Sequence, residues 1–128
     1  MTKKVLYINN IGKHPTFSQL LTKEGYRVDT VHDVDAGRQQ LHARDYDVII
    51  LQENPETESW QLCEEIRRLS DLPLIVISRS ASTETCVRAI NAGADYFLRK
   101  PFGPLEFVAR VQSLLQRIPL RQATSISQ

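Results

Sequence analysis

The 128-residue sequence has few of the features that mark special classes of protein. It has only two cysteines, Cys63 and Cys86, and neither has another Cys or a His at ligand spacing beside it. We therefore expect two reduced thiols and no zinc site. Its apolar runs, such as residues 48–51, are far shorter than the roughly 20 residues that cross a bilayer, and the N-terminus lacks a signal peptide's apolar stretch. These absences predict a cytoplasmic protein with no membrane partner.

The sequence also has almost no net charge. Its 16 Lys and Arg residues face 15 Asp and Glu residues, and no run of Lys or Arg forms a basic patch. Nucleic-acid binding by this segment alone is therefore not expected. No glycine-rich phosphate loop follows the first apolar run and no GxSxG motif is present, so nucleotide binding and serine hydrolysis by those routes are not expected either. The composition, 41% hydrophobic and 24% charged, is typical of one globular domain.

Short apolar or β-branched runs alternate with longer segments of helical periodicity, a pattern typical of βαβ units in a parallel sheet. Strands are expected at residues 5–8, 26–31, 48–51, 72–77 and 94–98. Helices are expected between Pro15 and Gly25, after a cap at Asp33 or Asp35, and over about 58–69, 82–92 and 104–118. The polar alternation of 26–31 indicates an edge strand. We expect one domain over residues 1–118, followed by a tail or linker at 119–128 without helical or strand periodicity.

Polar side chains cluster where the predicted strands end. In an open parallel sheet, ligands bind beyond the carboxyl ends of the strands, so these are the residues that would carry any chemistry. They are Asn9, Asn10, Gln52, Glu53, Ser78, Arg79 and Lys100.

The segment 91–102, NAGADYFLRKPF, is similar to the AGAD-x-[YF]-x-x-KPF signature of response-regulator receiver domains. The resemblance extends over residues 3–117 and implies a flavodoxin-like α/β fold. That fold is a (βα)5 doubly wound parallel sheet of five strands in the order 2-1-3-4-5. The last predicted helix resembles that of receivers that precede a winged-helix DNA-binding domain. The resemblance therefore implies a role in two-component signal transduction and transcription regulation.

The chain departs from the family where the family's chemistry resides. In receivers, two carboxylates after the first strand and an Asp after the third bind Mg²⁺, and that Asp accepts a phosphoryl group from a histidine kinase. Here the pair is Asn9 and Asn10, and the third strand offers Gln52, or Leu51 if the alignment is anchored on Pro55. Amides lack the charge that recruits Mg²⁺ and cannot form an acyl phosphate. We therefore expect no catalytic residue, metal or cofactor, and a protein that is not an enzyme.

Four further positions match parts of the receiver switch. Ser78 matches the hydroxyl that contacts the phosphoryl group, although it could equally satisfy backbone groups at the strand end. Lys100 matches the family's salt-bridging lysine, with Glu53 or the neighbouring amides as its expected partners. Phe97 matches the aromatic switch position, where a core role is the simpler interpretation. The resemblance implies a cis bond before Pro101 that aims Lys100 into the crevice.

The favoured hypothesis is an atypical receiver that acts by protein contacts and dimerisation without phosphorylation. The resemblance implies a two-fold dimer through the helix at 82–92, the strand at 94–98 and the helix at 104–118. The candidate contact residues on that face are Arg88, Asp95, Glu106, Arg110 and Arg117. A merely solvated charged face is the simpler alternative. A sensor kinase or another regulatory protein is a possible partner, and DNA would be bound only through a C-terminal domain that this chain lacks.

Three alternatives remain open from the sequence. Glu53 could substitute as the phosphoacceptor, although it would point to the other side of an extended strand. Glu53 and Lys100 could form an ion pair that mimics the activated state and makes the protein constitutively dimeric. The chain could also act as a stand-alone adaptor without a DNA-binding partner domain.

Overall fold

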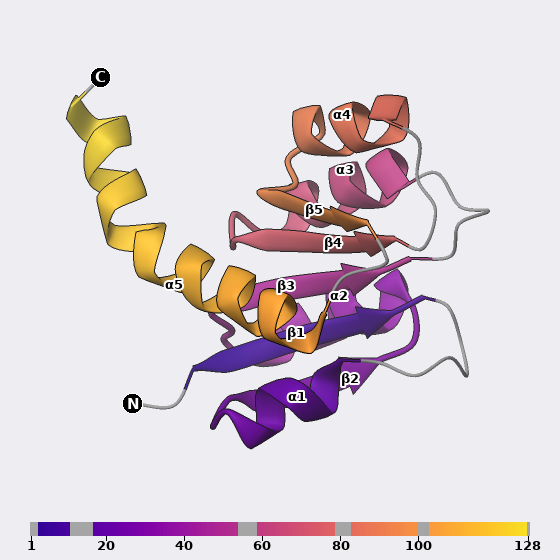
Figure 1. The fold of residues 1–128 in the computed structure, drawn as a ribbon. Helices are drawn as coiled ribbons and strands as arrows, with labels where there is room; N and C mark the ends of the chain where they lie inside the picture. The colour runs from indigo at the N-terminus through magenta and orange to yellow at the C-terminus, as the bar shows by residue number, and fades with distance from the viewer. Residues whose placement is uncertain (1–2, 11–16, 54–58, 79–82, 100–102, 128) are drawn as a thin grey trace.

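Five parallel strands form one sheet between two layers of helices (Figure 1). The computed structural model describes residues 3–10, 17–53, 59–78, 83–99 and 103–127. The strands are β1 (Lys4–Asn9), β2 (Arg27–Val31), β3 (Val48–Gln52), β4 (Leu74–Ser78) and β5 (Tyr96–Arg99). They lie in the order β2-β1-β3-β4-β5, and all neighbouring pairs are parallel. The flavodoxin-like arrangement and strand order expected from the resemblance are confirmed.

The helices alternate with the strands along the chain. They are α1 (Ser18–Lys23), α2 (Val34–Ala43), α3 (Ser59–Leu69), α4 (Thr83–Asn91) and α5 (Pro104–Ser127). Asp33, rather than Asp35, caps α2, since its carboxylate accepts the Ala36 N–H at 2.7 Å. Gly25 and Gly93 follow α1 and α4 with φ of +94° and +122°, the left-handed conformation expected of residues that end a helix.

Several element boundaries differ from the sequence-based expectation, and the fourth strand begins at Leu74 rather than residue 72. The fifth strand begins at Tyr96 rather than residue 94, because the Ala94 N–H still donates to the Ala89 carbonyl of α4. The last helix continues from Pro104 to Ser127, past residue 118 where the apolar periodicity ends. Residues 119–127 are therefore helical, and the predicted division into a domain and a tail remains a prediction.

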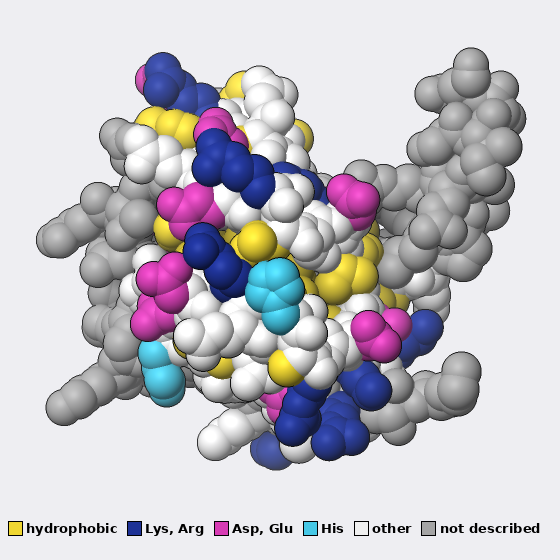
Figure 2. Space-filling view, turned by 180° about the vertical axis from the view of Figure 1, so that it is seen from behind, with side chains coloured by type: hydrophobic (Ala, Val, Ile, Leu, Met, Phe, Trp, Pro, Cys, Tyr) yellow, Lys and Arg dark blue, Asp and Glu magenta, His cyan; other side chains and the backbone are white. Residues whose placement is uncertain are grey.

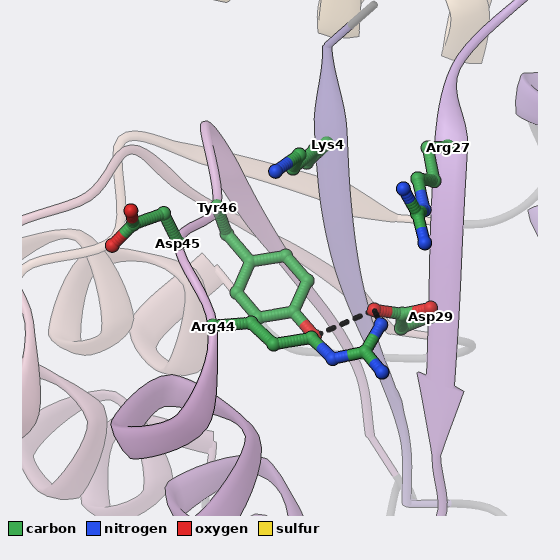
Figure 3. Close-up of a pocket in the computed structure, with 6 residues that line it drawn as sticks. All are labelled: Lys4, Arg27, Asp29, Arg44, Asp45 and Tyr46. Atoms are coloured by element: carbon green, nitrogen blue, oxygen red, sulfur yellow. Dashed lines mark hydrogen bonds and ion pairs between the residues drawn. The ribbon is translucent and has the colours of Figure 1, made fainter.

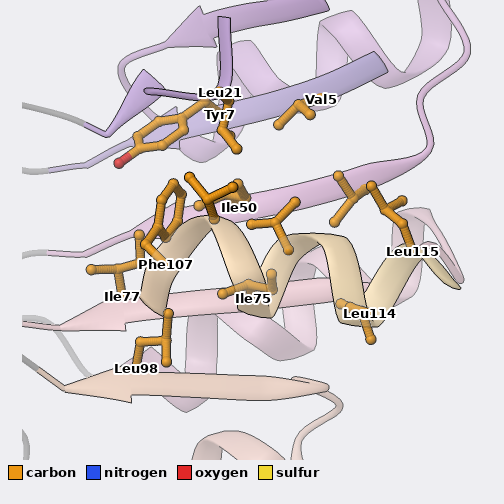
Figure 4. Packing of buried hydrophobic residues seen from close by; sticks show 13 residues of the cluster. Val5, Tyr7, Leu21, Ile50, Ile75, Ile77, Leu98, Phe107, Leu114 and Leu115 are labelled. Atoms are coloured by element: carbon orange, nitrogen blue, oxygen red, sulfur yellow. The ribbon is translucent and has the colours of Figure 1, made fainter. Parts of the chain in front are cut away.

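The sheet divides the hydrophobic core into two layers. Every residue of β3 and β4 is buried, since helices cover both faces, whereas β2 lies at an edge and keeps exposed positions. One layer packs alternate strand residues against α1 and α5, with Phe107 fully buried at its centre (Figure 4). The other layer packs the remaining strand residues against α2, α3 and α4, and includes the free thiol Cys63. The two layers fix which side of the sheet each strand-end side chain faces.

Candidate functional site

Four buried polar side chains meet at the carboxyl ends of the central strands. Asn9 ends β1 and is the register partner of Gln52, which ends β3, while Ser78 ends β4. Glu53 follows Gln52, and its N–H extends the ladder by donating to the Ile77 carbonyl at 3.0 Å. All four residues are 1–3% exposed. Polar groups this deeply buried carry a desolvation cost, so their partners determine what the site can do.

On the α1 and α5 side of the sheet, the Gln52 amide is bound to Tyr7. The Tyr7 hydroxyl donates to Gln52 Oε1 and accepts the Phe17 N–H at 3.1 Å. Burial raises the pKa of Tyr7 and the Phe17 bond opposes that rise, so the hydroxyl stays protonated as a donor. Sequence reasoning treated Tyr7 only as a strand residue. The sequence offered one signal, a hydroxyl in an otherwise aliphatic buried strand. A buried hydroxyl requires a polar partner.

On the α3 side of the sheet, Glu53 lies beside Ser78 and Cys63. Neither Glu53 Oε2 nor Ser78 Oγ has a hydrogen-bond partner among the described residues. Burial raises the pKa of Glu53 to about 7, and the nearby Ser78 hydroxyl lowers it by less, without the geometry of a standard hydrogen bond. Burial of the Cys63 thiol is the main cause that raises its pKa to about 12, and the Glu53 charge contributes to the same rise. The Ser78 hydroxyl has no backbone partner among the described residues, which exclude residues 79–82, so its role at the strand end stays a prediction.

The structure places the remaining switch residues as follows. Leu51 lies fully buried in the α2–α4 core layer, so Gln52 is the β3 residue that faces its polar neighbours. Phe97 is partly buried and packs against the same layer, in agreement with a core role. Lys100 and Pro101 lie outside the described residues, and so does Arg79.

The candidate dimer residues differ in how they are placed. Asp95 was expected on an exposed face. Its carboxylate instead binds Arg67 at 2.9 Å, and its side chain is only 6% exposed. Arg88 is exposed but pairs with Glu84 at 2.7 Å and lies over the Trp60 ring. The Arg110 guanidinium lies over the Tyr96 ring, Glu106 is exposed, and the side chain of Arg117 lies outside the described residues. Sequence reasoning missed Val87 and Ile90, which are exposed apolar residues on one side of α4.

The described part of the chain contains neither a membrane-spanning helix nor a metal cluster. None of its helices is long and apolar enough to cross a membrane. Within these same residues, no three His, Cys, Asp or Glu side chains group closely enough to hold a metal ion.

Comparison with known proteins identifies relatives that are named as regulators. The probable transcriptional regulator ycf27 of Cyanidium caldarium is 35% identical over 116 residues, which are 90% of this chain and 46% of that protein. The response regulator ArlR of Staphylococcus aureus is 32% identical over 108 residues, 84% of this chain and 49% of that protein. This chain therefore spans about half the length of the curated relatives it matches.

Solved structures share the fold at lower identity. A two-component response regulator from Clostridium difficile superposes with a TM-score of 0.80 at 22% identity, covering 91% of this chain and 98% of that chain. NtrX from Brucella abortus superposes with a TM-score of 0.83 at 23% identity, covering 100% of this chain and 30% of that chain. The sequence model of the response regulator receiver domain matches residues 14–112, which include four of the five strands. The chain therefore belongs to the response-regulator receiver domain family.

Proposed function

We propose that this receiver domain transmits signals by protein contacts, without accepting a phosphoryl group. The observation that carries the proposal is the chemistry of the strand ends, where Asn9, Asn10 and Gln52 supply amides at the positions of the family's carboxylates. An amide cannot attack a phosphoryl donor to form an acyl phosphate. The Gln52 amide oxygen is moreover engaged by the Tyr7 hydroxyl.

The strand-end residues also do not fit the Mg²⁺ that receivers use. A hard divalent cation is normally recruited by at least one carboxylate that neutralises part of its charge. The carboxylate of Glu53, the residue after β3, lies on the α3 side of the sheet, while the Gln52 amide lies on the α1 and α5 side. The proposal therefore includes no metal-dependent step.

Incubation with Mg²⁺ and acetyl phosphate tests this directly. We expect the intact-protein mass to remain unchanged, because Gln52 supplies an amide at the acceptor position and the Glu53 carboxylate is buried on the α3 side of the sheet. A receiver that carries all three acids, treated in parallel, shows that the donor is active. A stoichiometric, hydroxylamine-labile gain of one phosphoryl group would contradict the proposal.

The same experiment tests whether Glu53 acts as a substitute phosphoacceptor. Its carboxylate is nucleophilic in kind, but it is 2% exposed and faces α3 rather than Asn9 and Gln52. If an adduct formed on the wild type and disappeared in Glu53→Gln, the substitute-acceptor function would replace our proposal.

We further infer that the domain forms a homodimer through α4, β5 and α5 and serves a transcriptional regulator. The relatives ycf27 and ArlR are named as regulators and are about twice as long, which leaves room for a DNA-binding domain beyond this segment. Val87 and Ile90 are 52% and 41% exposed on α4, where burial against a second copy would be favourable. A sensor kinase or another regulatory protein is a possible upstream partner in this proposal.

Sedimentation equilibrium tests the dimer. Val87→Glu places a charge in the apolar part of the proposed interface and is expected to weaken dimerisation at least about ten-fold. Gln39→Glu, an exposed change on α2 away from this face, is the control. A monomeric wild type, or equal dimerisation in both variants, would exclude this interface and favour a solvated face or a monomeric adaptor.

A further inference from the structure

Two cations lie side by side at the edge of the sheet opposite the strand-end site. Lys4 begins β1 and Arg27 begins β2, and the two residues are direct register partners in this parallel pair. Like charges at such a position repel each other and destabilise the pairing. Neither side chain has an ion-pair partner among the described residues. Their juxtaposition therefore places two cations, neither with an ion-pair partner in the described part of the chain, at one point of the sheet edge.

A hollow of about 170 Å³ lies at this pair of cations (Figure 3). The residues that line it are Lys4, Arg27, Asp29, Arg44, Asp45 and Tyr46. They come from β1, from β2 and from the segment between α2 and β3, so the hollow is built by three separate parts of the chain. The hollow is therefore a polar depression formed by distant parts of the chain, and not a row of lysines along one element.

The acidic groups nearby are already engaged or exposed. Asp29 accepts the Tyr46 hydroxyl at 2.7 Å and pairs with Arg44 at 3.7 Å. The Asp47 carboxylate accepts the Lys4 backbone N–H at 2.8 Å. Asp45 is exposed and points away from the two strands in Figure 3. The Asp29 bonds hold Tyr46 and Arg44 in place, and the lining as a whole, with the cations Lys4, Arg27 and Arg44 and the carboxylates Asp29 and Asp45, carries one net positive charge.

We propose that this hollow, which we call the amino-edge site, binds a phosphate group. Phosphate carries between one and two negative charges at neutral pH, which matches the two unpaired cations. A guanidinium offers a planar fork suited to two phosphate oxygens, and an ammonium adds a point charge. In Figure 2 Lys and Arg side chains gather along the lower part of the molecule, while the two signs alternate above them. The ligand is either free phosphate or the phosphate of a small phosphomonoester.

Titration of the ¹⁵N-labelled protein with inorganic phosphate at constant ionic strength tests the amino-edge site. We expect saturable amide shifts at Lys4, Arg27 and residues 44–46, with none at Gln52. Arg27→Gln should weaken binding about ten-fold, because a charge-assisted hydrogen bond is lost. Arg68→Gln, an exposed cation on α3, should leave the binding curve unchanged. A parallel titration with glycerol 3-phosphate distinguishes the sources, because tighter binding than phosphate indicates a phosphomonoester and equal binding indicates free phosphate.

A thermal-unfolding measurement provides a second readout. Phosphate should raise the melting temperature of the wild type more than chloride at equal ionic strength, because it binds only the folded state. This difference should disappear in Arg27→Gln. Non-saturable shifts, equal weakening in Arg27→Gln and Arg68→Gln, or equal stabilisation by phosphate and chloride would each overturn the proposal. None of these outcomes depends on the chemistry of the strand-end site.

Discussion

Replacing Glu53 with Gln is expected to stabilise the domain above neutral pH by about 2–3 kcal/mol. The Glu53 carboxyl is 2% exposed, and burial raises its pKa from 4.5 to about 7. The folded protein therefore binds this proton more tightly than the unfolded chain does. It follows that the contribution of Glu53 to stability is fully present below about pH 4.5, is lost as the pH rises from there through about 7, and stays at the lower level beyond it. The amide introduced by Glu53→Gln has the same shape without the charge, and Ser78 Oγ is available to accept its N–H.

Urea denaturation at about pH 5 and about pH 8.5 measures this effect, with the single tryptophan, Trp60, as the fluorescent reporter. Glu64→Gln, an exposed change on α3, is the matched control and should leave the pH dependence intact. A loss of stability in Glu53→Gln at the higher pH would contradict the expectation. That result would instead support an ion pair between Glu53 and Lys100, because removing one partner of a buried pair leaves the other charge uncompensated.

Replacing Arg67 with Ala is expected to lower the free energy of unfolding by about 3 kcal/mol. The guanidinium lies between the α3–β4 and α4–β5 connections and donates to the Gly93 carbonyl at 2.9 and 2.6 Å, to the Ser70 carbonyl at 3.3 Å and to the Leu72 carbonyl. It also pairs with the Asp95 carboxylate, which then accepts the Leu74 N–H at 2.8 Å. Truncation leaves several carbonyls and a nearly buried carboxylate without this partner.

The conservative variant separates charge from geometry. Arg67→Lys retains the charge but not the planar fork that reaches all these acceptors, so it should recover only part of the lost stability. Arg68→Ala, one residue later and exposed, should change the stability by less than about 0.5 kcal/mol. Equal stability of Arg67→Ala and Arg68→Ala in urea denaturation would show that the Arg67 hydrogen bonds contribute nothing to the fold.

The fold could be predicted because its signals are local. The buried runs at 48–51 and 72–77 are apolar at nearly every position, the pattern of strands covered on both faces, and Gly25 and Gly93 mark helix ends by their backbone freedom. The segment 91–102 indicated the family, and the family implies the strand order. The apolar periodicity alone does not predict that order. The end of α5 was missed because residues 119–127 form a helix without a continued apolar stripe.

The partners within the site could not be predicted, because they come from residues far apart in sequence. Gln52 binds Tyr7 across 45 positions, and Arg67 binds Asp95 across 28. Nothing in the sequence near Asp95 indicates that an arginine from α3 reaches it, so it was assigned to an exposed face. The sequence identified the strand-end residues. Predicting which side of the sheet each one faces would have required the register of the strands.

The Tyr7 hydroxyl bond has a mechanical consequence. It connects the end of β3 to the Phe17 backbone, and the Phe17 ring contacts the Phe107 ring at 5.1 Å between centroids, with the ring planes tilted by 39°. Three contacts therefore connect the Gln52 side chain to the first turn of α5, and they lie on the side of the sheet away from α4. None of the three contacts involves a phosphoryl group, so a change at Gln52 has a continuous path of side chains to the C-terminal helix.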